Sequence, residues 1–187
     1  MGRWEPDARG RLSEAAMALF TERGFEQTTV AEIAARAGLT ERTFFRYFAD
    51  KREVLFGGGE RLQAEMVAAV RDAPAGATPM AAASAALDAA AAFLPEREQA
   101  CRRHRVVAAH SELRERELIK MATLAGALGA ALRARGVKEP TASLTAETVI
   151  AVFRVAFERW VAEKNRTGLR ALIKDSLDEL TAVTAAG

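Results

Sequence analysis

Cysteine, long apolar runs and leader segments are scarce or missing in this chain of 187 residues. The single cysteine, Cys101, cannot form a disulfide within the chain, which favours a reducing compartment. No apolar run reaches the roughly eighteen residues of a membrane-spanning helix. No basic segment followed by an apolar one opens the chain. We therefore expect a cytoplasmic protein without a membrane partner.

Sequence patterns for catalysis, phosphate binding and metal binding are also missing. His110, Ser111 and Glu112 are adjacent, so on a helix they point apart and cannot form a triad. The three glycines that begin at Gly57 lack the Lys and Ser or Thr of a phosphate-binding loop. His104 and His110 have no Cys or carboxylate partner at metal-ligand spacing. We therefore expect that the protein is not an enzyme and that it binds neither a cofactor nor a metal ion.

The segment from Thr28 to Lys51 has the pattern of two short helices joined by a tight turn. Thr29 and Glu32 form a capping-box pattern, and Thr40 can cap the second helix. Gly38 lies at the turn, where glycine adopts a positive φ without steric cost. Apolar residues at helical spacing surround it: Ile33, Ala34, Ala37, Leu39, Phe44 and Tyr47. This pattern predicts a DNA-binding helix-turn-helix.

Helices are also predicted on both sides of this motif. Ala8 to Arg23 forms an amphipathic helix closed by Gly24, and Asp50 with Glu53 marks a further helix start. A helix is expected from Lys51 through Val70, weakened in its middle by the three glycines. The apolar face of the first helix comprises Leu12, Ala15, Ala16, Leu19 and Phe20. An all-α chain follows, with a DNA-binding domain at residues 1–50 and a second helical domain at residues 51–187.

The motifs LFTERGF, TTVAEIA, AGLT, TFFRYF and DK occur in this order between Ala8 and Leu55. This set resembles the TetR (tetracycline-repressor-like) family of transcriptional regulators. The resemblance implies three N-terminal DNA-binding helices and a larger helical domain that dimerises and holds a small-molecule effector. It also implies a tyrosine where this chain has Phe45, so a phosphate contact through a phenol is missing there. Tyr47 and Lys51 match the family pattern.

Side-chain chemistry assigns roles in DNA binding. Thr29, Tyr47 and Lys51 lie near helix ends and suit phosphate contacts. Arg42 is the candidate for a guanine, because its guanidinium can donate two hydrogen bonds. A solvated helix face is the alternative, and Phe45 suits either a contact or the core. The side chains expected near the major groove are Thr40, Glu41, Arg42, Thr43, Phe45 and Arg46.

Charge is balanced in the first 55 residues, which hold nine Lys or Arg and nine Asp or Glu. Between Arg36 and Arg52, however, five basic residues accompany only Glu41 and Asp50. Positive charge is therefore concentrated where phosphates are expected. Strong binding should then require a dimer on a pseudo-palindromic operator in double-stranded DNA.

The last two predicted helices, Thr145 to Lys164 and Leu169 to Val183, are the candidates for a homodimer interface. The first is apolar nearly all round and needs cover on two faces. A larger monomer core is the alternative. Before them we expect a helix from Met80 to Leu94, ended by Pro95, and one or two helices from Glu96 to Arg135. The stripe expected to be buried there is Leu113, Leu118, Met121, Leu124, Leu128 and Leu132.

A pocket for a small apolar or amphipathic effector of unknown identity is expected among these helices. Its predicted lining is Phe93, Arg102, Arg103, Val106, Met121, Leu124, Phe153 and Phe157. The basic run from Arg102 to Arg105 suits the anionic end of a ligand such as an acyl-CoA. Plain core and a solvated face are the alternatives. A ligand-released repressor is the expected function; a helical adaptor that binds only protein leaves Arg42 and Tyr47 without a purpose.

Overall fold

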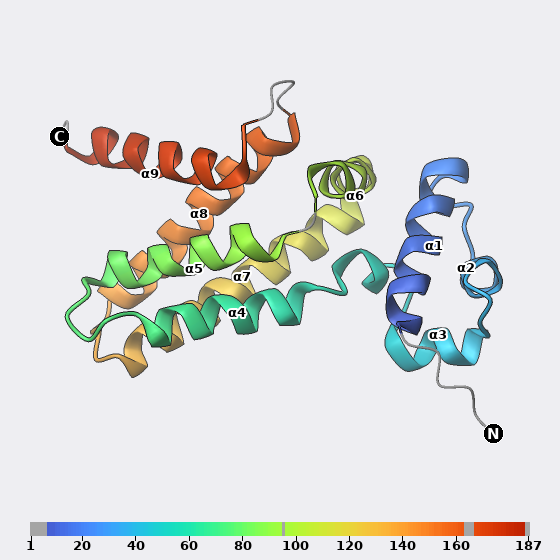
Figure 1. The fold of residues 1–187 in the computed structure, drawn as a ribbon, viewed down its shortest axis with the longest axis horizontal. Helices are drawn as coiled ribbons and strands as arrows, with labels where there is room; N and C mark the ends of the chain where they lie inside the picture. Colours follow the sequence, from blue (N-terminus) through green and yellow to red (C-terminus); the bar gives the residue numbers. More distant parts are fainter. Residues whose placement is uncertain (1–6, 95, 163–166, 186–187) are drawn as a thin grey trace. The chain divides into compact units, whose positions relative to one another are not determined.

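The computed structural model describes residues 7–94, 96–162 and 167–185, and the regular structure within them is helical throughout (Figure 1). This confirms the all-α prediction. The chain divides into two compact units. The N-terminal unit comprises Met1–Gly58 and Arg102–Glu117, and the C-terminal unit comprises Gly59–Cys101 and Leu118–Gly187. The predicted domain boundary after residue 50 stays a prediction.

The N-terminal unit is built on three helices, α1 (Ala8–Arg23), α2 (Val30–Arg36) and α3 (Glu41–Tyr47). A short 3-10 helix, η1 (Glu53–Phe56), follows them. The end of α6 (Arg97–Ala109) and the beginning of α7 (Ser111–Ala134) also belong to this unit. The apolar cluster that joins these elements includes Leu12, Leu19, Phe20, Ile33, Phe44, Val107 and Leu113.

The predicted helix starts of the helix-turn-helix are confirmed. The backbone N–H of Glu32 donates to Thr29 Oγ1 at 3.2 Å, and the Glu32 carboxylate accepts from the backbone N–H of Thr29 at 2.9 Å. In α3, Thr40 Oγ1 accepts from the N–H of Thr43 at 3.2 Å. Gly38 has a φ of +68°, as the turn requires. These local bonds fix the bounds of α2 and α3.

The predicted helix from Lys51 through Val70 is wrong in its first half. Asp50 does cap the segment, since its Oδ1 accepts from the N–H of Glu53 at 2.9 Å. The 3-10 helix that follows ends at Phe56, and α4 begins only at Gly59 and ends at Asp72. Glycine in a helix interior costs about 1 kcal/mol relative to alanine. Three in succession therefore interrupt the helix instead of weakening it.

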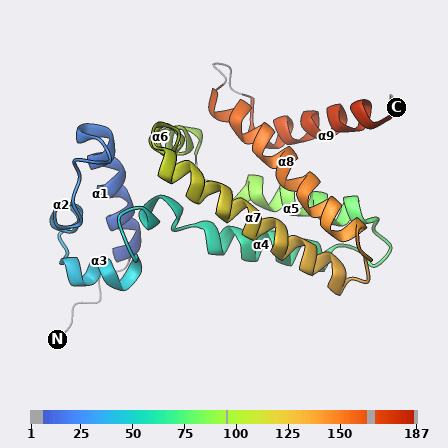
Figure 2. The same ribbon diagram turned by 180° about the vertical axis from the view of Figure 1, so that it is seen from behind.

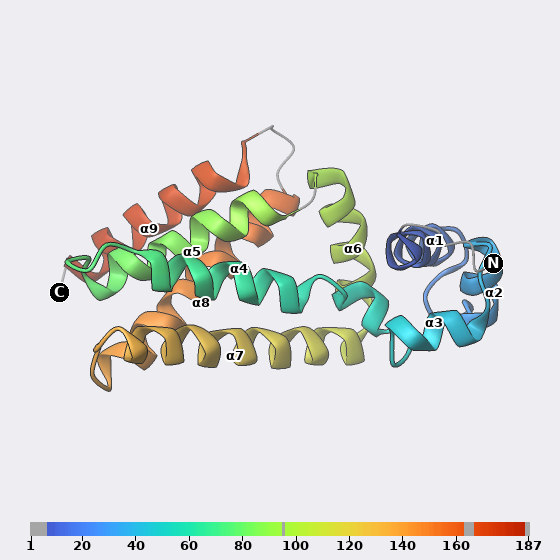
Figure 3. The same cartoon turned by 60° about the horizontal axis from the view of Figure 1, so that its bottom comes forward.

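The C-terminal unit contains α4, α5 (Pro79–Phe93), α8 (Thr141–Ala162), α9 (Leu169–Ala185) and most of α7. Helices α4 and α5 lie side by side as a hairpin, and α8 packs against both α5 and α9 (Figures 2 and 3). Thr78 caps α5 and Pro79 occupies its first turn, as predicted. Pro95 and Lys164 lie outside the described residues.

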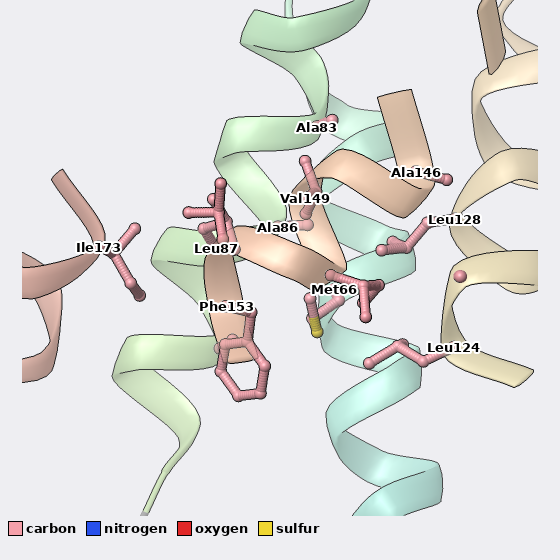
Figure 4. Close-up of a cluster of buried hydrophobic side chains, with 14 of the residues drawn as sticks. Met66, Ala83, Ala86, Leu87, Leu124, Leu128, Ala146, Val149, Phe153 and Ile173 are labelled. Carbon is pink, nitrogen blue, oxygen red and sulfur yellow. The ribbon is translucent and has the colours of Figure 1, made fainter. Parts of the chain in front are cut away.

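Small side chains bring the helices of this unit close together. Ala83 and Ala86 of α5 and Ala146 of α8 are buried beside larger residues (Figure 4). The larger residues labelled there are Met66, Leu87, Leu124, Leu128, Val149, Phe153 and Ile173. The predicted α7 stripe is wrong for Leu118, whose side chain is 58% exposed. Among the described residues, no helix is both long and apolar enough to cross a membrane.

Candidate nucleic-acid interface

Helix α3 carries a row of exposed side chains and one buried anchor. Phe44 is fully buried and holds the helix on the N-terminal unit. Phe45 is 55% exposed and Tyr47 is 38% exposed, so both rings are accessible from solvent. Of the residues predicted to contact DNA, those that are exposed are Thr29, Thr40, Glu41, Arg42, Phe45, Arg46 and Tyr47, while Thr43 and Lys51 are partly buried.

Arg42 and Arg46 are the cations of α3, and neither is paired with an acid among the described residues. Arg42 forms no side-chain hydrogen bond or ion pair there. Arg46 lies 4.9 Å from the ring centroid of Tyr47 and donates to the Tyr47 hydroxyl at 3.3 Å. Both guanidiniums therefore keep donors for phosphate or base oxygens.

Other cations of the N-terminal unit are used within the protein. Arg36 forms a bidentate pair with Glu22, with both N–O distances at 2.7 Å. This hydrogen-bonded pair lowers the pKa of Glu22 and raises the pKa of Arg36. Arg23 donates to Glu32 at 2.9 Å, and Arg11 Nε donates to the carbonyl of Ala37 at 3.1 Å. These three arginines are therefore already bonded to groups of the protein.

Lys51 contacts the protein itself. Its Nζ donates to the carbonyl oxygen of Phe25 at 2.9 Å, and to those of Glu26 and Thr28 at 3.2 Å each. The ammonium also lies 4.4 Å from the centroid of the Phe25 ring. The sequence carried no signal for this arrangement, because backbone carbonyl acceptors leave no trace in residue identity. The predicted phosphate contact of Lys51 stays a prediction.

Charged residues also join the segment after α3 to the corner between α6 and α7, within the same unit. Arg116 Nε donates to Glu53 at 2.7 Å, and its guanidinium lies 3.5 Å from Asp50. Arg52 pairs with Glu112 at 3.2 Å. Sequence reasoning missed this charge network, since its members lie about sixty residues apart along the chain.

Arg103 belongs to the same corner. Its Nε donates to the carbonyl of Leu55 at 2.7 Å and its other nitrogen pairs with Glu117 at 2.8 Å. The guanidinium lies 5.0 Å from the ring centroid of Phe56. The structure thus gives Arg103 a role in holding the N-terminal unit together, where the sequence suggested a ligand contact.

The predicted effector-pocket residues fall into both units. Phe93, Met121, Leu124, Phe153 and Phe157 belong to the apolar cluster of the C-terminal unit. Leu124 and Phe153 are buried, whereas the other three are partly buried at its margin. The remaining three, Arg102, Arg103 and Val106, belong to the N-terminal unit. The pocket as a whole stays a prediction.

The C-terminal unit has an open hollow of about 660 Å³ between α5 and α9, which sequence reasoning missed. Its apolar lining comes chiefly from Ile173 and Leu177, and Asp88 pairs with Arg170 at its margin at 3.7 Å. No group of three or more potential metal ligands occurs among the described residues. His110, considered for catalysis, lies 3.6 Å from a carboxylate oxygen of Glu26.

Comparison with known proteins supports the assignment of the N-terminal helices. The family model "Bacterial regulatory proteins, tetR family" matches residues 12–56. The transcriptional regulator TcmR of Streptomyces glaucescens is 40% identical over 81 residues, which cover 43% of this chain and 36% of TcmR. The matched segment spans about a third or less of the length of the curated relatives.

Solved structures match nearly the full chain at lower identity. A TetR-family regulator from Syntrophomonas wolfei has a TM-score of 0.67 at 18% identity, covering 97% of this chain and 96% of that one. FadR of Thermus thermophilus, described as a TetR-family repressor in complex with lauroyl-CoA, has a TM-score of 0.53 at 26% identity, covering 92% and 93%. Residues 12–56 thus match the model of the tetR family of bacterial regulatory proteins, and the all-α fold that continues them resembles solved structures of TetR-family regulators.

Proposed function

We propose that this chain is a sequence-specific, DNA-binding transcriptional regulator of the cytoplasm, and that it acts as a repressor. The observation that carries the proposal is the exposure of two arginines on α3, the second helix of a helix-turn-helix that matches the tetR family model. Its buried Phe44 anchors the helix, while Arg42 and Arg46 remain exposed and without an acidic partner among the described residues. A guanidinium in the major groove can donate two hydrogen bonds to a guanine.

The proposed binding unit is a homodimer formed through α8 and α9. Apolar side chains remain exposed on these helices, with Leu144 at 64%, Val155 at 46% and Val183 at 67%. Exposed apolar residues on two helices that already pack against each other suit burial against a second copy. Two N-terminal units then occupy half-sites about one helical turn, roughly 34 Å, apart on a pseudo-palindrome.

The proposed effector is a small apolar or amphipathic molecule bound in the C-terminal unit. Phe93, Met121 and Phe157 lie partly buried at the margin of the core, and such apolar side chains suit the lining of a pocket for an apolar ligand. The match to FadR, a repressor in complex with lauroyl-CoA, favours an acyl-CoA type of ligand. By linkage, such an effector lowers DNA affinity by the factor by which DNA lowers effector affinity.

Binding to selected DNA tests the proposal. Duplexes selected from a random pool by the purified protein should share a pseudo-palindrome, and fluorescence anisotropy should give two chains per site. Arg42→Gln should weaken this complex by about 1–3 kcal/mol, or roughly five- to 160-fold, for each of the two half-sites, by the usual value of a bidentate base contact. Lys138→Gln, an exposed cation of the C-terminal unit, is the matched control and should bind normally.

Two results separate the parts of the proposal. Equal affinity for selected and scrambled duplexes, or an Arg42→Gln complex as tight as the wild type, contradicts sequence reading by α3. Addition of lauroyl-CoA to the DNA complex, with free coenzyme A as control, tests the effector class. Release by lauroyl-CoA alone supports an acyl-CoA ligand, and no release by either removes that class.

A further inference from the structure

We propose that Lys51 is a positioning residue that sets the geometry of the DNA-binding helices without contacting a phosphate. The inference rests on the proposed DNA-binding function. Lys51 follows α3 in the chain, yet its ammonium lies in the turn between α1 and α2. The side chain of Lys51 therefore links the segment that follows α3 to the turn that joins α1 and α2 in the N-terminal unit.

The donors of Lys51 are fully used. An ammonium has three N–H groups, and three carbonyl oxygens, those of Phe25, Glu26 and Thr28, accept hydrogen bonds from Nζ. The face of the Phe25 ring adds a favourable contact with the cation. A phosphate oxygen must therefore displace one of these acceptors, and the displaced carbonyl loses its hydrogen bond to Lys51.

The acceptors belong to a turn that needs a cation. The three carbonyls lie in the loop between the end of α1 at Arg23 and the start of α2 at Val30, where no helical ladder supplies their donors. Phe25 and Thr28 are each 1% exposed, so water has little access to these two side chains of the turn. Thr28 Oγ1 additionally donates to the carbonyl of Gly24 at 2.9 Å. Lys51 adds three hydrogen bonds to this turn from a part of the chain that follows α3.

The position of the turn matters for DNA because α2 begins directly after it. Thr29, the next residue, caps α2 and is exposed. Fixing the turn to the chain that leaves α3 fixes the angle between α2 and α3. Loss of the ammonium therefore lowers specific affinity through misplacement of both helices.

Salt dependence distinguishes positioning from contact. Each phosphate contact made by a cation contributes about 0.9 to the slope of log K against log salt concentration. A dimer in which Lys51 binds phosphate loses about 1.8 from that slope when both lysines are removed. A dimer in which Lys51 positions the helices loses affinity while its slope stays unchanged.

The experiment measures affinity for the selected duplex at several salt concentrations for wild type and Lys51→Met. We expect at least a tenfold loss of specific affinity, with the salt slope of the variant within about 0.5 of the wild-type value. Lys138→Met removes the same charge from an exposed site of the C-terminal unit and controls for the overall field. A slope lowered by about 1.8, or an affinity equal to wild type, overturns the proposal.

Lys51→Arg guards against a variant that fails to fold. A guanidinium is planar and does not converge on three carbonyls, but it binds phosphate as well as an ammonium does. Positioning predicts at least a fivefold loss of affinity for the folded arginine variant, whereas a phosphate contact predicts affinity within twofold of wild type.

A measurement without DNA separates this inference from the proposed function. A lysine ammonium held in three hydrogen bonds exchanges its protons slowly and gives a resolved nitrogen-proton correlation in the free protein. We expect one such signal at neutral pH, absent from the Lys51→Arg protein. Absence of this signal from the wild type overturns the proposed positioning role of Lys51. Failure of the wild type to select any DNA sequence, with the signal present, counts against the regulator alone.

Discussion

At the scale of single residues, hydrogen bonds within the protein decide what each charged group can do. Glu32 is an example, because its carboxylate accepts from both the backbone N–H and the hydroxyl of Thr29, at 2.9 and 3.0 Å. These bonds, assisted by Arg23, hold the pKa of Glu32 below the ordinary range of glutamate. The carboxylate therefore stabilises α2 at neutral pH.

Acid should remove this contribution. A group whose folded pKa is lowered stabilises the fold above its ordinary pKa and loses that effect as pH falls through the lowered value. Glu32→Gln should therefore lower the Tm at pH 7, while the two proteins should converge towards pH 3. Thermal unfolding followed by circular dichroism at both pH values checks this. A difference in Tm that is the same at both contradicts it.

Sequence patterns predicted the residue-scale features that depend on near neighbours in the chain. The caps at Thr29 and Thr40 and the positive φ of Gly38 are set within a few residues, and all three are confirmed. The bonds of Lys51 and Arg103 were not predicted, because they end on carbonyl oxygens 23 to 48 residues away. Any residue supplies such an acceptor.

At the scale of elements, the corner between α6 and α7 holds the segment that follows α3 by charge. Arg116 of α7 contacts both Glu53 and Asp50, and these three side chains are 22% to 35% exposed. Such partial burial makes a hydrogen-bonded pair worth more than one on an open surface. Asp50 meanwhile accepts a hydrogen bond from the N–H of Glu53, the first residue of η1.

Arg116→Met should therefore loosen residues 50–56 before it affects the rest of the N-terminal unit. Losing these bonds should cost about 1 kcal/mol, which corresponds to roughly fivefold faster amide exchange in that segment. Hydrogen exchange followed by mass spectrometry measures it. Arg133→Met is the control. Arg133 lies near the end of α7 and forms an exposed pair with Glu139, which follows that helix, so its loss should leave the segment unchanged. Equal exchange in both variants contradicts a stabilising role of the corner.

Element bounds followed the strength of the local signals. The predicted bounds of α1 are confirmed in full, and Gly24, which was expected to close the helix, follows its last residue with a φ of +85°. The helix expected from Lys51 is interrupted because three glycines outweigh the apolar spacing on either side of them. Leu118 fits the α7 periodicity and is still exposed, because periodicity alone does not show where a helix leaves its packing partner.

At the scale of the whole molecule, the proposed dimer makes a specific demand on α8. Val155 is apolar and 46% exposed on a helix proposed to meet its own copy. In a two-fold interface a substituted carboxylate faces a buried apolar surface and a second carboxylate nearby, which costs several kcal/mol. The assembly should then separate into monomers.

Val155→Glu should raise the dimer dissociation constant at least a hundredfold and abolish tight operator binding. Analytical ultracentrifugation over a range of concentrations measures the first effect. Leu118→Glu replaces a residue that is 58% exposed on α7 and should remain dimeric. A dimeric Val155→Glu protein contradicts an interface centred on α8, and a monomeric Leu118→Glu protein points to α7 instead.

The internal use of cations in the N-terminal unit has a consequence for how the proposed regulator finds its site. Arg11, Arg23, Arg36 and Lys51 are engaged within the protein, whereas Arg42 and Arg46 of α3 have no acidic partner among the described residues. Non-specific affinity for DNA comes almost entirely from cations facing phosphates. A genome offers millions of competing sites. Few molecules are then held on irrelevant sequence, so a small cellular pool is enough to keep one operator occupied.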